Sequence, residues 1–225
     1  MLAECAEHGF YRAETCSTCG EKGRFLMSDQ EVDRLGRIMA GILRHFPDRF
    51  GLTMDSYGWV DIRDMTGAIR EQKQKMHWLR PHHVQAIVDT DEKGRYQIDG
   101  GMVRATYAHS IDVVLDDLPL CDTESLFYPV AEEELDIVLE AGLHPSDRKK
   151  LHLSGSYDQA YSAGRVKIET PIVLKIDAAA AGSNGVEIRR AGKSVYVAED
   201  IGPEYLSVAE APEGFEPPAQ VEAEP

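Results

Sequence analysis

The sequence predicts an α+β fold, and three observations support this class. A helical pattern of apolar residues runs through residues 28–50, at Leu35, Ile38, Met39, Ile42 and Leu43. Short apolar runs bounded by Gly, Pro and Asp fill residues 101–207 and indicate strands. Three of the four cysteines lie within the first 20 residues, which suggests a metal-binding segment ahead of two larger parts.

Length and charge limit the classes of function. At 225 residues the chain can bury one good core or two small ones. Its formal net charge of −15 argues against a non-specific coat on nucleic acid, yet it allows an anionic ligand held by a few local arginines. The sequence has no apolar run that could span a bilayer, and its start lacks the features of a signal peptide. We therefore expect a cytoplasmic protein with no membrane partner.

Residues 1–27 are expected to form a zinc-binding segment. Two residues separate Cys5 from His8, and two separate Cys16 from Cys19. Two close ligand pairs across a short spacer suit a tetrahedral Cys3His zinc site, and Gly20 allows a tight turn after the second pair. The alternative is three reduced thiols in a frayed terminus, because a disulfide is not expected in the cytosol.

The helix within residues 28–50 ends in an Arg-His pair. Ser28 is its expected N-cap, and Pro47 stops it because a proline disfavours helical geometry in the residue before it. Arg44 and His45 therefore fall in the last turn. The helix dipole favours cations there, so capping alone is one explanation of the pair.

Residues 28–100 are expected to form a winged-helix lobe. Three further elements are predicted: a helix over residues 61–70, a helix from Pro81 to about Val88, and a hairpin that joins strands at residues 86–89 and 95–98 through a turn at residues 90–94. Three helices followed by a hairpin is the element order of a winged-helix module.

Residues 101–207 are expected to form a second, strand-rich lobe. Its short apolar runs lie at residues 111–115, 126–130, 149–153, 171–176, 186–188 and 195–197. Two helices are predicted, from Ala131 to Ala141 before Gly142 and from Ser156 to Gly164. Residues 208–225 are acidic and proline-rich, so we expect a disordered tail.

Two more arginines stand in short motifs of the second lobe. Arg104 lies in Val-Arg-Ala, and Arg148 lies between a Gly-Leu pair and His152-Leu153-Ser154. Taken alone, each could be an exposed strand residue or part of a solvated basic turn, as arginines usually are.

Together and in this order, the motifs resemble the NAD-dependent RNA (tRNA) 2′-phosphotransferase family over about residues 30–206. They are Arg44-His45, Gly51-Leu52, Asp55 to Val60, Lys93 to Tyr96, Val103 to Ala105, His109-Ser110, Gly142-Leu143, Arg148 and His152 to Ser154. No single tripeptide is specific, but the ordered set is. The Cys/His segment resembles the zinc-binding extension of archaeal members.

The resemblance implies an ADP-ribosyltransferase-like lobe at residues 101–207 and a catalytic set of Arg44, His45, Arg104 and Arg148 that meets in a cleft between the lobes. It implies NAD as co-substrate and an RNA with an internal 2′-phosphate as partner, as in tRNA splicing. The phosphate would be transferred to NAD, releasing nicotinamide and forming ADP-ribose 1″,2″-cyclic phosphate. Arginine suits such a substrate because it grips phosphate with two hydrogen bonds and keeps its charge.

The resemblance also implies which residues contact NAD: His109, Ser110, Tyr128, His152 and Ser154. Two departures from the family pattern stand out. Tyr128-Pro129-Val130 replaces a frequent His-Gly-Thr, and Ala108 replaces the glycine of Gly-His-Ser. For the two histidines, a purely structural role is the alternative.

Two other functions stay open on sequence alone. One is ADP-ribosyl transfer to a terminal phosphate of RNA or DNA at the same site. The other is a non-catalytic zinc and winged-helix protein that binds nucleic acid, although the helix that begins at Pro81 carries no Arg or Lys to contact phosphates. We expect a monomer in each case.

Overall fold

A computed structural model describes residues 1–146 and 148–217 and confirms a mixed α+β protein with a large sheet. Its contacts divide the chain into two units, Met1–Asp117 and Leu118–Pro225. Residues 101–117, which we assigned to the second lobe, are thus grouped with the first unit. Within the described part of the chain, none of the helices has the length and apolar character to cross a membrane.

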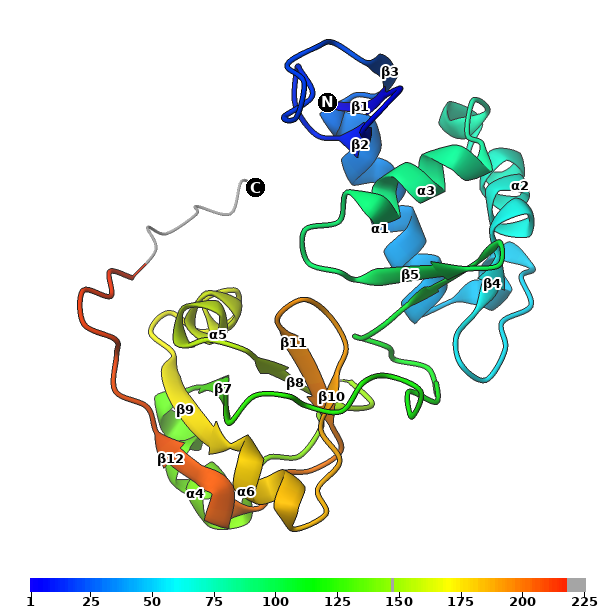
Figure 1. Ribbon diagram of the computed structural model, residues 1–225. Coiled ribbons are helices and arrows are strands. Elements are labelled where there is room, and N and C mark those ends of the chain that lie inside the picture. The colour runs from blue at the N-terminus through cyan, green and yellow to red at the C-terminus, as the bar shows by residue number, and fades with distance from the viewer. Residues whose placement is uncertain (147, 218–225) are drawn as a thin grey trace. The chain divides into compact units, whose positions relative to one another are not determined.

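The first unit contains two three-stranded antiparallel sheets and three α-helices (Figure 1). One sheet has the order β2-β1-β3, with β1 (Leu2–Cys5), β2 (Gly9–Tyr11) and β3 (Arg24–Met27). The other has the order β4-β6-β5, with β4 (Val60–Asp61), β5 (Tyr96–Asp99) and β6 (Met102–Ala105). The helices are α1 (Asp29–Arg44), α2 (Ile62–Gln72) and α3 (Pro81–Asp89), with short 3-10 helices η1 (Pro47–Phe50) and η2 (Gln74–Met76).

Helix α1 follows the sequence prediction closely at both ends. The Ser28 hydroxyl accepts a hydrogen bond from the backbone of Glu31, whose carboxylate accepts one from the backbone of Ser28. This capping box satisfies two donors that would otherwise lack partners at the helix start. The helix ends at Arg44, and Pro47 begins η1. Its apolar face packs into a single core that includes residues of all three helices and of β5 and β6.

The predicted strand at residues 86–89 is wrong, because α3 continues to Asp89. Ala86 and Ile87 are buried in the core of the first unit, and the Thr90 hydroxyl donates to the carbonyl of Ala86 at the helix end. A short apolar run has too little periodicity to separate helix from strand. The hairpin instead joins β5 to β6, and β6 also pairs with β4.

The second unit is built on one six-stranded antiparallel sheet with the order β10-β11-β8-β7-β9-β12. Its strands are β7 (Ser125–Val130), β8 (Leu151–Ser154), β9 (Ile172–Asp177), β10 (Arg189–Arg190), β11 (Val195–Ala198) and β12 (Leu206–Val208). Helix α5 (Tyr157–Gly164) covers one face, while α4 (Leu135–Ala141) and α6 (Ala178–Ser183) contribute to the core on the other (Figure 1).

Three expectations for the second unit and its neighbouring segment need correction. The apolar runs at residues 111–115 and 186–188 form no strand. The predicted helix at residues 131–141 opens with the 3-10 helix η3 (Glu132–Glu134) before α4 begins. The expected tail is partly structured, because Val208 belongs to β12 and Phe215 packs edge-on against Tyr157 and Tyr161. Residues 218–225 of that tail lie outside the described residues.

Candidate functional site

Arg44 and His45 stand at the end of α1, beside the segment that follows β6. The carbonyl of Arg44 accepts a hydrogen bond from the backbone N–H of Ser110 at 3.0 Å. His45 Nδ1 lies 2.9 Å from the Ser110 hydroxyl, so Ser110 is tied to both residues of the pair. This brings the predicted phosphate-binding pair together with one of the predicted NAD contacts.

Two tyrosines frame the guanidinium of Arg44. Its Cζ lies 4.9 Å from the ring centroid of Tyr107 and 5.9 Å from that of Tyr96. Burial raises the pKa of both phenols, and the positive charge of Arg44 only partly offsets this effect. Both tyrosines therefore remain neutral at physiological pH, and their rings hold the arginine by cation–π contact.

Arg104 is buried, with only 2% of its surface exposed. From β6 it donates Nε to Gln97 at 2.9 Å and Nη1 to the carbonyl of Tyr57 at 3.3 Å. Its Nη2 lies 2.8 Å from a carboxylate oxygen of Asp117, and its Cζ lies 4.5 Å from the ring centroid of Trp59. Arg104 is therefore not the solvated strand residue that its type alone suggests.

His109 is also buried, at 5% exposure, and follows an unusual backbone position. Ala108 has φ +68°, the one positive φ of a non-glycine residue in the described ranges. This left-handed conformation is natural for glycine and costs an L-residue with a side chain energy. The backbone thus keeps the shape of a Gly-His-Ser motif although the glycine is replaced.

In the second unit, the predicted residues divide between the two faces of the sheet. His152 and Ser154 lie two positions apart on β8, so their side chains share one face. Ser154 pairs with Phe127, which puts Tyr128 on the opposite face, where it packs with the core that contains Leu126. Arg148 precedes β8 and is half-buried. The structure therefore brings His152 and Ser154 together but does not bring Tyr128 to them.

The four cysteine and histidine side chains of the first segment converge as their spacing predicts. The ligand atoms of Cys5, His8, Cys16 and Cys19 all lie within 4.8 Å of one another. Cys5 Sγ is 3.5 Å from His8 Nδ1 and 3.8 Å from Cys19 Sγ. A tetrahedral zinc ion with ordinary bond lengths would set these edges at about 3.6 and 3.8 Å.

The local backbone prepares this cluster for a metal. Gly20 has φ +75°, which provides the turn after the second cysteine pair. Hydrogen bonds from the backbone of Cys19 and Thr18 lower the pKa of Cys16 to about 6. The thiolate of Cys16, the form that binds metals, is therefore favoured at neutral pH. A backbone hydrogen bond at Glu21 lowers the pKa of Cys19, but burial and the neighbouring thiols of Cys16 and Cys5 outweigh it and raise that pKa.

Sequence reasoning missed the residues that surround Arg104. Trp59 and Tyr57 lie in one of the recognised motifs, so the motif itself was the available signal. Gln97 could have been found from a correct β5–β6 register, in which it pairs with Arg104. Asp117 carries no sequence signal, because an Asp-Asp pair in a connecting segment usually indicates a solvated surface.

Anchored arginines beside aromatic and polar side chains are an arrangement that suits the binding of phosphate groups. The sequence model of one protein family, described as RNA 2′-phosphotransferase, Tpt1/KptA family, matches residues 29–200. A probable RNA 2′-phosphotransferase of Methanosarcina barkeri is 40% identical over 210 residues, covering 93% of this chain and all (100%) of the relative. Probable RNA 2′-phosphotransferase 1 of Archaeoglobus fulgidus is 39% identical over 202 residues, covering 90% of this chain and 92% of the relative. A probable RNA 2′-phosphotransferase of Haloarcula marismortui is 32% identical over 220 residues, covering 93% of this chain and 98% of the relative. The chain therefore belongs to the RNA 2′-phosphotransferase family, and it is an enzyme of the transferase class.

Proposed function

We propose that the protein transfers an internal 2′-phosphate of RNA, such as a spliced tRNA, to NAD. The products are nicotinamide, ADP-ribose 1″,2″-cyclic phosphate and RNA with a 2′-hydroxyl. The observation that carries this proposal is the family match over residues 29–200, which includes every proposed catalytic residue. The anchored arginines of the first unit support it, because both substrates are polyanions.

The first step needs positioning more than acid–base chemistry. An oxygen of the 2′-phosphate bonds to the anomeric carbon of the nicotinamide ribose, and the bond from that carbon to nicotinamide breaks. Nicotinamide takes the electron pair and leaves as a neutral molecule, so no proton has to be supplied. Arg44, Arg104 and Arg148 would hold the phosphate for this attack, since guanidinium groups bind phosphate oxygens in fixed geometry.

The second step moves a proton as well as a phosphoryl group. The ribose 2″-hydroxyl attacks phosphorus, the bond between phosphorus and the RNA 2′-oxygen breaks, and that oxygen gains a proton. His45 would accept the proton of the attacking hydroxyl or supply one to the departing oxygen, with Ser110 orienting its ring. The arginines would neutralise the charge that develops on the phosphoryl oxygens.

His109, Ser110, His152 and Ser154 remain our candidates for contacts with NAD. The shared face of His152 and Ser154 on β8 supports a joint role for these two. Tyr128 was proposed for the same role, but its packing in the core of the opposite face makes it a structural residue in our interpretation.

The architecture of each unit supports the folds expected for the family. In the first unit, α1, α2 and α3 precede the β5–β6 hairpin and β4 completes the sheet, which supports a winged-helix assignment. In the second, a six-stranded antiparallel sheet with helices on both faces supports an ADP-ribosyltransferase-like lobe. We propose zinc for the Cys/His cluster, where it would stabilise the N-terminal sheet, and a monomeric, cytoplasmic enzyme.

The test is incubation of the protein with NAD and an RNA oligonucleotide carrying one internal 2′-phosphate. We expect release of nicotinamide together with the cyclic product. Matched RNAs with only a 5′- or 3′-terminal phosphate separate this reaction from ADP-ribosylation of ends, which would leave ADP-ribose on the RNA. Absence of both nicotinamide and cyclic product with the 2′-phosphorylated RNA would refute the proposal.

A further inference from the structure

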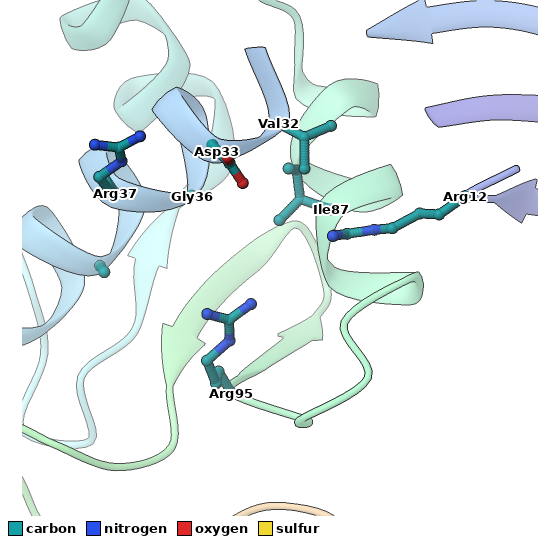
Figure 2. Close-up of a pocket in the computed structure, with 8 residues that line it drawn as sticks. Arg12, Val32, Asp33, Gly36, Arg37, Ile87 and Arg95 are labelled. Atoms are coloured by element: carbon teal, nitrogen blue, oxygen red, sulfur yellow. The ribbon is translucent and has the colours of Figure 1, made fainter. Parts of the chain in front are cut away.

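A second cluster of arginines surrounds a cavity of the first unit, of about 270 Å³. Arg12, Arg37 and Arg95 line it, and its apolar wall includes Val32 and Ile87 (Figure 2). We call it the arginine pocket. None of the catalytic or NAD-contacting residues proposed above lines it, so it is a separate feature of the molecule.

Arg12 comes from the segment that contains the Cys/His cluster, directly after β2. Its Nε donates to the Thr90 hydroxyl at 2.9 Å, and that hydroxyl is itself held at the end of α3. Within the described residues, its two terminal nitrogens make no hydrogen bond. Figure 2 shows the Arg12 guanidinium directed into the pocket. The hydrogen bond at Nε therefore orients the Arg12 guanidinium, and its two terminal nitrogens face the space where a ligand would bind.

Arg95 enters from the opposite side and is fixed more firmly. The carboxylate of Asp91 accepts its Nε at 2.9 Å and its Nη2 at 2.7 Å, and only 2% of the Asp91 side chain is exposed. The remaining nitrogen, Nη1, has no hydrogen-bond partner in the described part of the chain. In Figure 2 this side chain points toward the same space as Arg12.

Helix α1 forms the third wall and contributes both signs of charge. Arg37 stands at its outer side, and the carboxylate of Asp33 turns toward the cavity (Figure 2). The three arginines exceed the charges of Asp33 and of Asp91, so the surroundings remain positive. The chain as a whole has a net charge of −15. Residues 1–117, with 15 Lys and Arg against 19 Asp and Glu, account for only a small part of this acidic excess.

One arginine of the pocket shares an aromatic neighbour with the proposed catalytic pair. Arg44 and Arg95 both contact the ring of Tyr96, with Cζ at 5.9 and 5.7 Å from its centroid. A strand of RNA whose 2′-phosphate lies at Arg44 could therefore carry a neighbouring phosphate to Arg95. Among the described residues that line the arginine pocket, none is an aromatic side chain on which a base could stack, so the pocket suits the backbone rather than a base.

We propose that the arginine pocket binds a backbone phosphodiester of the RNA substrate next to the nucleotide that carries the 2′-phosphate. This inference rests on the proposed function. It gives the Cys/His segment a role in substrate binding, because that segment supplies Arg12. The contact is independent of base sequence, and it adds affinity and register without taking part in the reaction.

The test measures binding without catalysis. A fluorescently labelled single-stranded RNA without 2′-phosphate is titrated with the full chain in the absence of NAD, across a series of salt concentrations. We expect Arg12→Ala and Arg37→Ala each to weaken binding about two- to fivefold, as for exposed charge pairs. The slope of log Kd against log salt should fall by about 0.7 for each lost contact.

Two further variants sharpen the comparison. Arg34→Ala removes another exposed arginine of α1 that does not line the pocket, and it should bind RNA like the unaltered protein. Asp33→Asn removes the carboxylate that faces the cavity, and it should bind RNA more tightly. Unchanged thermal unfolding of each variant would show that the fold is intact.

The outcomes separate this proposal from the proposed function. If Arg12→Ala, Arg37→Ala and their combination bind RNA with unchanged affinity and salt slope, the pocket proposal is wrong even where phosphate transfer occurs. A rise in the KM for NAD with unchanged RNA affinity would overturn it as well, because the pocket would then hold the diphosphate of NAD. Weaker RNA binding without any transfer by the unaltered protein would sustain the pocket and refute the reaction.

Discussion

Arg104 and Asp117 form a bidentate ion pair in the first unit. Nη1 of Arg104 donates to Oδ1 of Asp117 at 3.1 Å, and Nη2 lies 2.8 Å from Oδ2. The Arg104 side chain is 3% exposed, whereas that of Asp117 is 41% exposed. The carboxylate thus occupies the edge of the guanidinium that two oxygens of a phosphate would take. Under the proposed function, the RNA phosphate competes with Asp117 for Arg104.

Replacement of Asp117 by Asn should lower the KM for 2′-phosphorylated RNA by about fivefold, the size of a half-exposed charge interaction. The amide removes the competing charge but keeps the shape of the side chain. Steady-state kinetics with varied RNA and saturating NAD would measure the effect, and Asp116→Asn is the matched control. A fall in kcat with an unchanged KM would show instead that Asp117 positions Arg104.

The catalytic assignment predicts different outcomes for two arginines. Arg148→Ala should lower kcat/KM by at least about 100-fold with little change in unfolding temperature, since a transition-state contact is lost. Arg104→Ala should also lower stability, by about 1–3 kcal/mol, because buried partners lose their hydrogen bonds. Chemical denaturation and kinetics on both variants would check this, with exposed Arg70→Ala as control. Full activity in Arg148→Ala would remove that residue from the catalytic set.

Replacement of Ala108 by Gly should stabilise the protein by about 0.5–1 kcal/mol. The left-handed φ of Ala108 costs about 1–2 kcal/mol, and the greater freedom of glycine in the unfolded chain returns part of this gain. Urea denaturation would measure the difference. Ala68→Gly, in the interior of α2, is the matched control and should destabilise by about 1 kcal/mol. Loss of stability in both variants would contradict the argument.

The stability of the folded protein in acid should also depend on the ionisation of Asp91. Burial alone raises the pKa of this carboxyl, but hydrogen bonds from the side chain and backbone of Arg95 outweigh it, so the net pKa is lowered. Its stabilising contribution is therefore present above the ordinary pKa near 3.8 and is lost as pH falls through the folded-state value. Asp91→Asn should cost about 1–3 kcal/mol at pH 7 and progressively less below about pH 4. Chemical denaturation at several pH values would measure the difference in unfolding free energy between this variant and the unaltered protein. A difference that stays constant with pH would contradict the argument.

If the Cys/His cluster holds the proposed zinc, removal of this metal should loosen the N-terminal sheet. We expect purified protein to contain zinc, and a strong chelator or Cys19→Ser to lower the unfolding temperature, because metal binding contributes folding free energy. Cys121→Ser is the control, since Cys121 lies outside the cluster. Protein that elemental analysis finds free of zinc, with unfolding unaffected by chelator, would leave the cluster as reduced thiols.

Local signals predicted much of the first unit. The Ser28 cap, Glu31 and Pro47 fixed the ends of α1, and the spacing of Cys5, His8, Cys16 and Cys19 predicted their convergence. Each of these signals lies within a few residues of the structure that it determines.

Non-local contacts explain most of the failures. Residues 86–89 are helical because Ala86 and Ile87 meet a core formed by distant elements, which their own sequence does not reveal. The burial of Arg104 depends on Trp59 and Asp117, contributed by separate segments. The sequence also did not reveal that Tyr128 lies on the opposite face of the sheet from His152 and Ser154, because a strand buried on both faces has apolar residues at every position, which hides the direction of each side chain.

The stacking of Trp59 on Arg104 provides an intrinsic optical probe. The chain contains two tryptophans, so Trp78→Phe would leave Trp59 as the sole indole emitter. Its emission should respond to any rearrangement of the guanidinium 4.5 Å from its ring. Stopped-flow mixing with RNA could then follow, in real time and without a label, how the enzyme reorganises before chemistry begins.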